Sequence, residues 1–485
     1  MHLHVRDLAA RGAAFGTSGV RGTVEALTDE VAFAYATAFL QTVVARAEPA
    51  GTPIAIGFDL RPSSPRIATA VAAACTARGH TVVNCGPIPT PALAHHAIER
   101  RVPAIVITGS HIPFDRNGIK FYASKGEILK EDEGAITAAT VELPEGAFAD
   151  GMLRAPAPLP AVDPAARDLY RRRYLDYFQP GFLRGRRVGV YQHSSVVRDL
   201  LADLLRDLGA EVIALGRTDT FVPIDTEAVS EADQRQAREW VAAHRLDAIV
   251  STDGDADRPL VGDETGAFLR GDVVGMLCAG YVGARTVVTP VSSNTAVDRW
   301  GRFERVIRTR IGSPYVIAAM DGALAAGLGP VVGYEANGGF LLGSDVTSPR
   351  GTRLAALPTR DSVLPMLSLL AMAAERGVPL SRITEGLPAR YTASDRLQQF
   401  PVERSRAILA RLRSGPEALR AFFAGAGEVS GVDETDGVRV TLRGGDIVHL
   451  RPSGNAPELR CYAEADTPGR AKELCAWGLR AAAPA

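Results

Sequence analysis

Short runs of apolar residues recur along the first part of the chain, separated by stretches with helical periodicity. Pro53–Asp59, Thr81–Cys85 and Ala104–Thr108 each have the length and composition of a buried strand. A helix of small residues is expected over Ser64–Arg78. Buried strands that alternate with helices are typical of βαβ units. We therefore expect an α/β domain with a mixed or parallel sheet over residues 1–154.

The same pattern returns after a proline-rich segment, residues 155–164, which is expected to be a semi-rigid linker. Strands are expected over Arg187–Tyr191, Glu211–Leu215 and Ala248–Ser251, with helices over Val196–Leu208 and Glu231–His244. These elements predict a second α/β domain over residues 165–266.

A third α/β domain is expected over residues 267–386, with strands near Thr286–Thr289 and Pro330–Gly333. The remaining segment, 387–485, has a different pattern, because two alternating stretches at 437–442 and 447–450 resemble a hairpin. The fold class that we expect is thus α/β, with three similar mixed α/β domains and a C-terminal α+β domain.

The length of the chain indicates several hydrophobic cores, and its net charge limits the kinds of molecule that it binds. The 485 residues are too many for one hydrophobic core. A net charge of -1 argues against a nucleic-acid partner bound by bulk electrostatics. No apolar run is long enough to cross a bilayer, and the N-terminal residues lack the apolar centre of a signal peptide. The odd number of cysteines, 5, without a Cys-x-x-Cys pair favours reduced thiols and a cytoplasmic protein.

Lysine is rare in this chain. Of the 54 basic residues, only Lys120, Lys125, Lys130 and Lys472 are lysines. Arginine stays protonated near neutral pH, whereas a lysine can be tuned to act as an acid or a base. The lysines are therefore of interest, although Lys125 and Lys130 have the simpler interpretation of surface charges.

Three carboxylates alternate with small residues at Asp253, Asp255 and Asp257, and Arg258 follows directly. Like charges so close raise one another's pKa, and a divalent cation such as Mg²⁺ relieves this repulsion. Arg258 suggests that an anion binds at the same place.

Two other interpretations of these aspartates exist. With Asp253 as position one of an EF-hand loop, Glu264 falls at position twelve, but position six is Arg258 rather than glycine. The run also follows an apolar strand instead of a helix. A solvated acidic turn is the second alternative.

A serine ends the predicted strand over Ala104–Thr108. Ser110 lies in the segment Thr108–Pro113, and the residues from Asp115 to Lys120 are expected to complete the loop. Sites in α/β proteins usually lie at strand ends. A phosphate on Ser110 would supply the ligand that the three aspartates lack, although most serines in such loops serve turns or helix caps.

Five motifs in this order resemble those of the α-D-phosphohexomutases, the phosphomannomutase/phosphoglucomutase superfamily. They are Phe15–Gly22 (N-terminal motif), Thr108–Tyr122 (phosphoserine loop), Asp253–Arg258 (metal loop), Gly333–Gly339 (sugar loop) and Arg451–Pro457 (phosphate loop). The resemblance spans nearly the whole chain and implies a central cleft where four domains meet.

The resemblance implies that Ser110 is carried as phosphoserine and that a phosphate oxygen, Asp253, Asp255 and Asp257 bind Mg²⁺. Phosphoserine would phosphorylate a hexose phosphate to give a hexose 1,6-bisphosphate. This intermediate would turn over in the cleft and return its other phosphate to Ser110.

Further roles follow from the same resemblance. Lys120 is the first choice for general acid/base, although it could simply balance the charge of phosphoserine. Arg21 would stabilise the phosphoryl group electrostatically. His111, beside Ser110, could orient the loop or take part in catalysis. The substrate-binding residues would be Arg258, Arg310, Glu335, Asn337, Arg451, Ser453, Gly454 and Asn455.

Four residues depart from the family pattern. Ile112 replaces a usual asparagine, Asn337 a frequent serine, Asn455 a frequent threonine and Arg310 a common lysine. None of these changes affects Ser110 or the aspartates, so they leave the reaction class in place and put the sugar specificity in doubt. Mannose phosphate is the first expectation, glucose phosphate the second and glucosamine phosphate the third.

Two alternatives belong to other classes. A metal-dependent serine phosphatase would transfer the phosphoryl group to water, and a sugar-phosphate sensor would bind without turnover. As a mutase, the protein would need a hexose phosphate as its partner, and neither nucleic acid nor a membrane. We expect a monomer or a homodimer.

Overall fold

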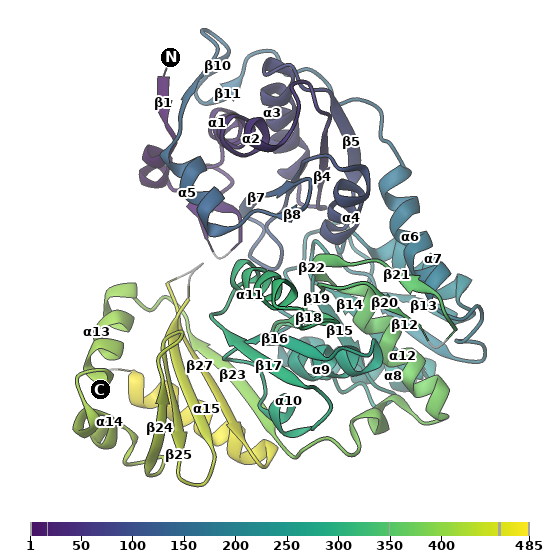
Figure 1. Ribbon diagram of the computed structural model, residues 1–485, viewed down its shortest axis with the longest axis vertical. Coiled ribbons are helices and arrows are strands. Elements are labelled where there is room, and N and C mark those ends of the chain that lie inside the picture. The colour runs from purple at the N-terminus through teal and green to yellow at the C-terminus, as the bar shows by residue number, and fades with distance from the viewer. Residues whose placement is uncertain (1, 17, 349, 454–456, 484–485) are drawn as a thin grey trace.

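The computed structural model describes residues 2–16, 18–348, 350–453 and 457–483. In these ranges the chain forms three mixed sheets flanked by helices, one larger antiparallel sheet and three two-stranded ribbons. Figure 1 shows the first sheet and its helices at the top of the molecule. The second and third sheets lie below it on one side, and the C-terminal sheet lies below it on the other. The expected fold class is confirmed.

The first sheet has the strand order β2-β3-β7-β6-β4-β5, with β8 on β7. Its strands are β2 (Ala14–Phe15), β3 (Val20–Thr23), β4 (Ile54–Phe58), β5 (Val82–Pro87), β6 (Ala104–Ile107), β7 (Arg116–Ala123) and β8 (Gly126–Glu127). The helices are η1 (Val5–Arg11), α1 (Asp29–Phe39), η2 (Leu40–Val44), α2 (Ala45–Ala47), α3 (Ser64–Ala77), α4 (Thr90–Arg100) and α5 (Lys130–Ala138). Two small ribbons pair β1 (His2–His4) with β9 (Thr140–Glu142) and β10 (Phe148–Ala149) with β11 (Met152–Leu153).

The second sheet has the order β13-β12-β14-β15. Its elements are α6 (Ala165–Tyr177), β12 (Arg187–Tyr191), α7 (Arg198–Asp207), β13 (Glu211–Leu215), α8 (Glu231–His244), β14 (Ala248–Thr252) and β15 (Pro259–Gly262). The third sheet has the order β17-β16-β18-β19-β22. Its strands are β16 (Thr286–Pro290), β17 (Arg305–Thr309), β18 (Val331–Tyr334), β19 (Phe340–Leu342) and β22 (Leu357–Asp361), with a ribbon of β20 (Val346–Thr347) and β21 (Arg353–Leu354). The helices are α9 (Gly271–Tyr281), α10 (Ala296–Arg299), α11 (Ser313–Ala325), α12 (Val363–Arg376) and η3 (Leu380–Thr384).

The C-terminal sheet is antiparallel, in the order β23-β27-β26-β25-β24. Its strands are β23 (Tyr391–Leu397), β24 (Val429–Asp433), β25 (Val438–Leu442), β26 (Ile447–Pro452) and β27 (Leu459–Ala465). The helices are α13 (Val402–Leu412), α14 (Pro416–Phe423) and α15 (Pro468–Ala482). The expected hairpin is confirmed, because β25 pairs with β26 in antiparallel register.

The three α/β sheets share one topology. In each, two strands lie parallel on either side of the first, and a fourth strand then pairs antiparallel with the third. The third and fourth strands are β6 and β7 in the first sheet, β14 and β15 in the second, and β18 and β19 in the third. The segments between them hold Ser110, the three aspartates and Glu335. The repeat therefore places three functional loops at equivalent positions.

Each of the four larger sheets forms a unit with its helices, and apolar packing joins the first three of these units. On one face of the first sheet, α1 and α3 enclose a core of their own that includes Phe39, Ile67 and Ile107. On the other face, α4 belongs to a core that continues through α6 into the second and third sheets, and includes Leu93 and Tyr170. The C-terminal unit has a separate core.

One local expectation was wrong. The residues up to Lys120 were expected to extend the serine loop, but Arg116–Ala123 is strand β7. It pairs antiparallel with both β3 and β6, with Lys120 opposite Val106. This long-range pairing outweighs the turn propensity of Asn117-Gly118. Within the described residues, no helix is long and apolar enough to cross a membrane.

Candidate functional site

Ser110 lies at the end of β6 in a constrained conformation. Its φ of 53° is left-handed, which is uncommon for a residue other than glycine and marks local strain. Its backbone N–H donates to the Thr108 hydroxyl at 2.8 Å, and its own hydroxyl donates to Asp253 Oδ2 at 2.5 Å. The side chain is thus aimed from the first unit at the aspartates of the second.

A buried arginine that the sequence did not single out supports this loop. Arg61 donates to the carbonyl oxygens of Ser110, Ile112, Pro113 and Arg116 at 2.5–3.1 Å. Asp59 holds Arg61 at 3.2 Å and also accepts from the Thr108 hydroxyl and the Gly109 N–H. A Cβ on Gly109 would lie 2.4 Å from the Arg61 guanidinium carbon, so the close approach requires glycine.

The three aspartates are fully buried and can present one oxygen each within 4.8 Å of one another. Burial, reinforced by Asp255 and Asp257, raises the pKa of Asp253 well above its ordinary value. One oxygen of Asp255 and one of Asp257, Oδ1 in both, are buried without a hydrogen-bond partner. Three buried carboxylates that can each present an oxygen so close to the others fit a hard divalent cation such as Mg²⁺.

Lys120 compensates part of this negative charge. Its ammonium group donates to Asp255 Oδ2 and Asp257 Oδ2, both at 2.7 Å, and its side chain is 1% exposed. Although burial alone would raise the pKa of Asp255, the charge and hydrogen bond of Lys120 lower it, assisted by the Thr90 hydroxyl. Lys120 therefore leaves the Oδ1 atoms available.

His111 and Arg258 form a second contact between the two loops. Arg258 Nη1 donates to His111 Nδ1 at 2.8 Å, and the Ser110 hydroxyl oxygen lies 3.3 Å from the same nitrogen. Burial, together with the nearby Arg258 guanidinium, lowers the pKa of His111 well below its ordinary value, so the imidazole is neutral.

Arg21 on β3 contacts the loop that carries Ser110. Its Nη1 donates to the Thr108 carbonyl at 2.5 Å, and burial lowers its pKa to about 10. A Cβ on Gly118 would meet Arg21 Nη1 at 2.1 Å, so this glycine leaves room for the guanidinium.

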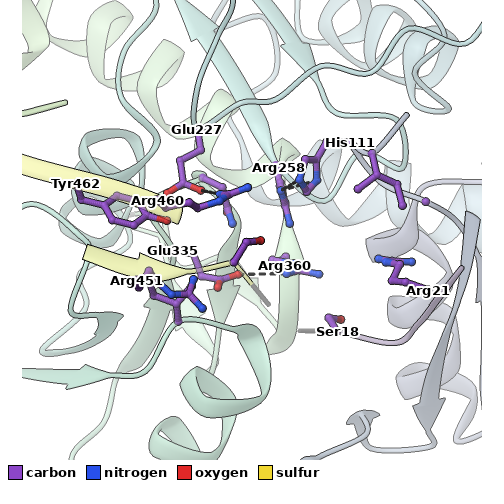
Figure 2. Close-up of a pocket in the computed structure, with 15 residues that line it drawn as sticks. Ser18, Arg21, His111, Glu227, Arg258, Glu335, Arg360, Arg451, Arg460 and Tyr462 are labelled. Carbon is purple, nitrogen blue, oxygen red and sulfur yellow. Dashed lines mark hydrogen bonds and ion pairs between the residues drawn. The ribbon is translucent and has the colours of Figure 1, made fainter. Parts of the chain in front are cut away.

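A cavity opens beside these groups. Its lining residues come from all four units and are Ser18, Arg21, Gly109, His111, Ile112, Glu227, Arg258, Ile311, Glu335, Asn337, Arg360, Arg451, Ser453, Arg460 and Tyr462. Figure 2 shows Arg451, Arg460 and Tyr462 on one side and Ser18 and Arg21 on the other. The arginines in this lining supply positive charge and forked donors that suit a sugar bearing phosphate groups.

The sugar loop predicted from the sequence forms one wall. Glu335 and Gly339 form a turn in which the Gly339 carbonyl accepts from Glu335 N–H at 3.1 Å. Asn337 Oδ1 accepts from Gly339 N–H at 2.9 Å, which is turn chemistry. Glu335 Oε2 accepts from Arg360 Nη1 at 3.2 Å.

Described residues of the phosphate loop also line the cavity, and Figure 2 shows Arg451 near Glu335. Arg451 lines the cavity and is 3.3 Å from Asp436 Oδ1, and Ser453 lines it too. Gly454 and Asn455 lie outside the described residues. Arg310 is placed in a neighbouring pocket that shares Arg451, where its Nε donates to the Thr435 carbonyl at 3.1 Å. The structure thus brings the predicted residues together, apart from Arg310 and the two outside the described ranges.

Sequence reasoning missed Arg61, Arg360, Arg460, Tyr462 and Glu227. Arg460 and Tyr462 alternate along β27 and point to the same side, so strand periodicity could have paired them. Arg61 and Arg360 lie outside the motifs, and in this arginine-rich chain their residue type carries little signal.

Comparisons with known proteins agree along the chain. The family models for phosphoglucomutase/phosphomannomutase match as follows: domain I at residues 12–145, domain II at 172–266, domain III at 270–391 and the C-terminal domain at 397–477. The phosphomannomutase of Sinorhizobium fredii is 46% identical over 469 residues, covering 96% of this chain and 98% of the relative. That of Salmonella muenchen is 47% identical over 457 residues, covering 94% and 92%.

Solved structures show the same fold. The putative phosphomannomutase from Thermus thermophilus superimposes with a TM-score of 0.72 at 23% identity, covering 95% of this chain and 97% of that one. Aspergillus fumigatus N-acetylphosphoglucosamine mutase in complex with GlcNAc-6P and magnesium gives a TM-score of 0.58 at 15% identity, covering 99% and 98%.

Proposed function

The chain belongs to the phosphoglucomutase/phosphomannomutase family and is a phosphohexomutase, and we propose that it interconverts mannose 1-phosphate and mannose 6-phosphate through phosphoserine at Ser110. The observation that carries this mechanism is the 2.5 Å hydrogen bond from the Ser110 hydroxyl to Asp253, beside a cavity lined by arginines. Identities of 46% and 47% to two phosphomannomutases favour mannose over glucose and glucosamine.

We propose Mg²⁺ as the cofactor. Asp253, Asp255 and Asp257 would hold it, together with a phosphate oxygen on Ser110. The Oδ1 atoms of Asp255 and Asp257, which have no hydrogen-bond partner, and the short distances between the three carboxylates support this donor set. When bound, the ion would neutralise charge on the phosphoryl group as it is transferred.

The residues of the chain would handle the rest of the reaction. In the first transfer the ester bond from phosphorus to Ser110 Oγ breaks, and a bond from phosphorus to a sugar hydroxyl oxygen forms. The sugar hydroxyl loses a proton and the serine oxygen gains one. We assign this proton transfer to Lys120, which lies beside Asp255 and Asp257 at 2.7 Å. The hexose 1,6-bisphosphate then turns over, and the reverse steps restore phosphoserine.

The remaining polar residues would bind and orient the sugar phosphate. Arg451, Ser453, Gly454 and Asn455 would hold the phosphate that is not being transferred, because a forked guanidinium and backbone donors suit a dianion. Glu335 and Asn337 would bind sugar hydroxyls. Arg21 and Arg258 would stabilise the transferring group, since buried cations act strongly in a site with little water.

The sugar is tested by measuring rates side by side on mannose 1-phosphate, glucose 1-phosphate and glucosamine 1-phosphate, with Mg²⁺ and a trace of the matching 1,6-bisphosphate. The proposal expects the largest kcat/KM for mannose 1-phosphate. A larger value for either other sugar would assign that sugar instead.

The phosphoserine is tested by mass spectrometry of the purified protein. We expect a phosphate adduct on Ser110 and no turnover by Ser110→Ala. An adduct elsewhere, with an active Ser110→Ala variant, would refute the mechanism. Release of inorganic phosphate at the rate of hexose 1-phosphate consumption would instead indicate a phosphatase.

A further inference from the structure

The side chain of Arg360 joins the metal loop to the sugar loop. Arg360 precedes the last residue of β22, and its side chain is only 5% exposed. Its Nε and Nη2 lie 3.0 and 2.9 Å from Asp257 Oδ2, and its Nη1 donates to Glu335 Oε2 at 3.2 Å. Figure 2 shows the guanidinium in the cavity wall, linked to Glu335. One cation thus contacts a proposed metal ligand and a proposed sugar ligand.

Gly339 leaves the space in which Arg360 lies. A Cβ on Gly339 would be 2.7 Å from Arg360 Cδ and 2.8 Å from its Cγ, closer than a real contact. Gly339 has no left-handed φ, so the requirement for glycine comes from the arginine stem and not from the backbone. Gly339, the last residue of the sugar loop, therefore leaves the room that the Arg360 side chain at the end of β22 needs.

The backbone on either side of Arg360 is firmly held. Asp361 accepts hydrogen bonds from the hydroxyls of Tyr170 and Tyr174 on α6. Ser362 donates its hydroxyl to the carbonyl of Ala256, within the aspartate loop, at 2.7 Å. These contacts fix the end of β22, and with it the backbone of Arg360, against the metal loop.

The contacts of Arg360 fix one oxygen of each carboxylate. On Asp257 both Arg360 and Lys120 bind Oδ2, whereas Oδ1 has no hydrogen-bond partner and lies 3.5 Å from Arg258 Nε. Groups that hold the second oxygen of a metal ligand fix its orientation. On Glu335, Arg360 holds Oε2 and thereby sets the direction of the other oxygen.

We propose that Arg360 is a positioning residue that orients Asp257 toward the metal and Glu335 toward the sugar, and that Gly339 is required to accommodate it. The inference deepens the proposed function and rests on the roles given there to Asp257 and Glu335. A planar guanidinium with several donors suits two carboxylates on opposite sides, and an ammonium group does not.

The test compares wild type with Arg360→Lys, Arg360→Met and Gly339→Ala. Mn²⁺ binding, followed by electron paramagnetic resonance in the absence of substrate, reports on Asp257, and KM for the hexose phosphate that wild type turns over reports on Glu335. We expect both Arg360 variants to bind Mn²⁺ about 10–100-fold more weakly. We also expect KM to rise, and Gly339→Ala to shift both readouts in the same direction although Arg360 is intact.

Arg66→Met is the matched control. Arg66 is a partly buried arginine that pairs with Asp29 at 2.5 Å, away from the cavity, so its loss lowers the melting temperature without changing Mn²⁺ affinity or KM. Arg360 variants that behave like this control, with unchanged Mn²⁺ affinity and KM, would overturn the inference. Gly339→Ala keeps the question open to test even if Arg360→Met fails to fold.

A double-mutant cycle tests separately whether Arg360 affects sugar binding through Glu335. If Arg360 acts through Glu335, the KM increase of Glu335→Gln combined with Arg360→Met is smaller than the product of the single increases. A KM increase equal to the product of the two single increases would refute the proposed action of Arg360 on Glu335. A preference of wild type for glucose phosphate would refute only the proposed sugar, because each comparison uses the sugar that wild type turns over.

Discussion

The ammonium group of Lys120 is held between two buried carboxylates. It lies 2.7 Å from both Asp255 and Asp257 and is fully enclosed. A guanidinium is wider and planar, and it stays protonated at neutral pH. We expect Lys120→Arg to lower kcat by about 100-fold or more, the range over which general acid–base groups act.

Lys125 provides the control for this substitution. It is an exposed lysine just beyond the same strand, and Lys125→Arg is expected to leave kcat unchanged. Steady-state rates on the preferred hexose 1-phosphate measure both variants. A Lys120→Arg variant with nearly normal kcat would remove Lys120 from the proton transfer.

A buried histidine makes stability depend on pH. Burial lowers the pKa of His449 on β26 to about 4, against about 6.5 in the unfolded chain. Between these values the unfolded state binds a proton that the folded state does not, so the free energy of unfolding falls as pH decreases from 6.5 toward 4. The loss approaches about 1.4 kcal/mol per pH unit. We expect denaturant midpoints to fall over this window, and less steeply in His449→Gln. Equal pH slopes for the two proteins would contradict the assignment.

At the scale of the elements, sequence alone predicted the functional motifs but missed one of the strands beside them. Ser110 and the aspartates were predictable because each motif is contiguous and follows an apolar strand. The strand β7 was not, because its position depends on pairing with β3 and β6. Arg61 and Arg360 escaped for a related reason. The loops that they contact are distant in sequence, 49 residues from Arg61 to Ser110 and 103 residues from Arg360 to Asp257.

The hydrogen bonds of Arg61 hold the serine loop in place. Arg61 donates to four loop carbonyls and is paired with Asp59, with both side chains at 0% exposure. Arg61→Met removes these donors and leaves a buried carboxylate without its cation, at a cost of about 3–5 kcal/mol. We expect a lower melting temperature and a loss of phosphate on Ser110 after incubation with hexose 1,6-bisphosphate.

Arg61→Lys separates loop geometry from charge. The lysine keeps a cation near Asp59 but cannot reach four carbonyls at once. We expect its melting temperature to recover further than its kcat does. If kcat and melting temperature recover together, charge alone holds the loop. The hydrogen bonds from Arg61 to the four carbonyls then have no separate role in positioning Ser110.

For the molecule as a whole, the cavity depends on contacts between units that are far apart in the chain. The segment after β13 in the second unit reaches the C-terminal sheet, where Asp225 pairs with Arg396 at 2.9 Å and Glu227 lies 3.5 Å from Arg460. Glu227 and Arg460 both line the cavity. The position of the C-terminal sheet, and with it Arg451, therefore depends on ion pairs as well as on the chain connection that precedes β23.

Breaking one of these pairs should loosen the cleft without unfolding any unit. Arg396 is 27% exposed and Asp225 14%, and partly exposed pairs contribute up to about 1 kcal/mol. We expect Arg396→Gln to raise KM by up to about fivefold, to make KM less sensitive to salt, and to increase the radius of gyration in small-angle X-ray scattering. Arg443→Gln removes an exposed pair with Glu428 inside the C-terminal unit and should change none of these. An unchanged KM and radius in Arg396→Gln would show that this ion pair adds nothing to closure.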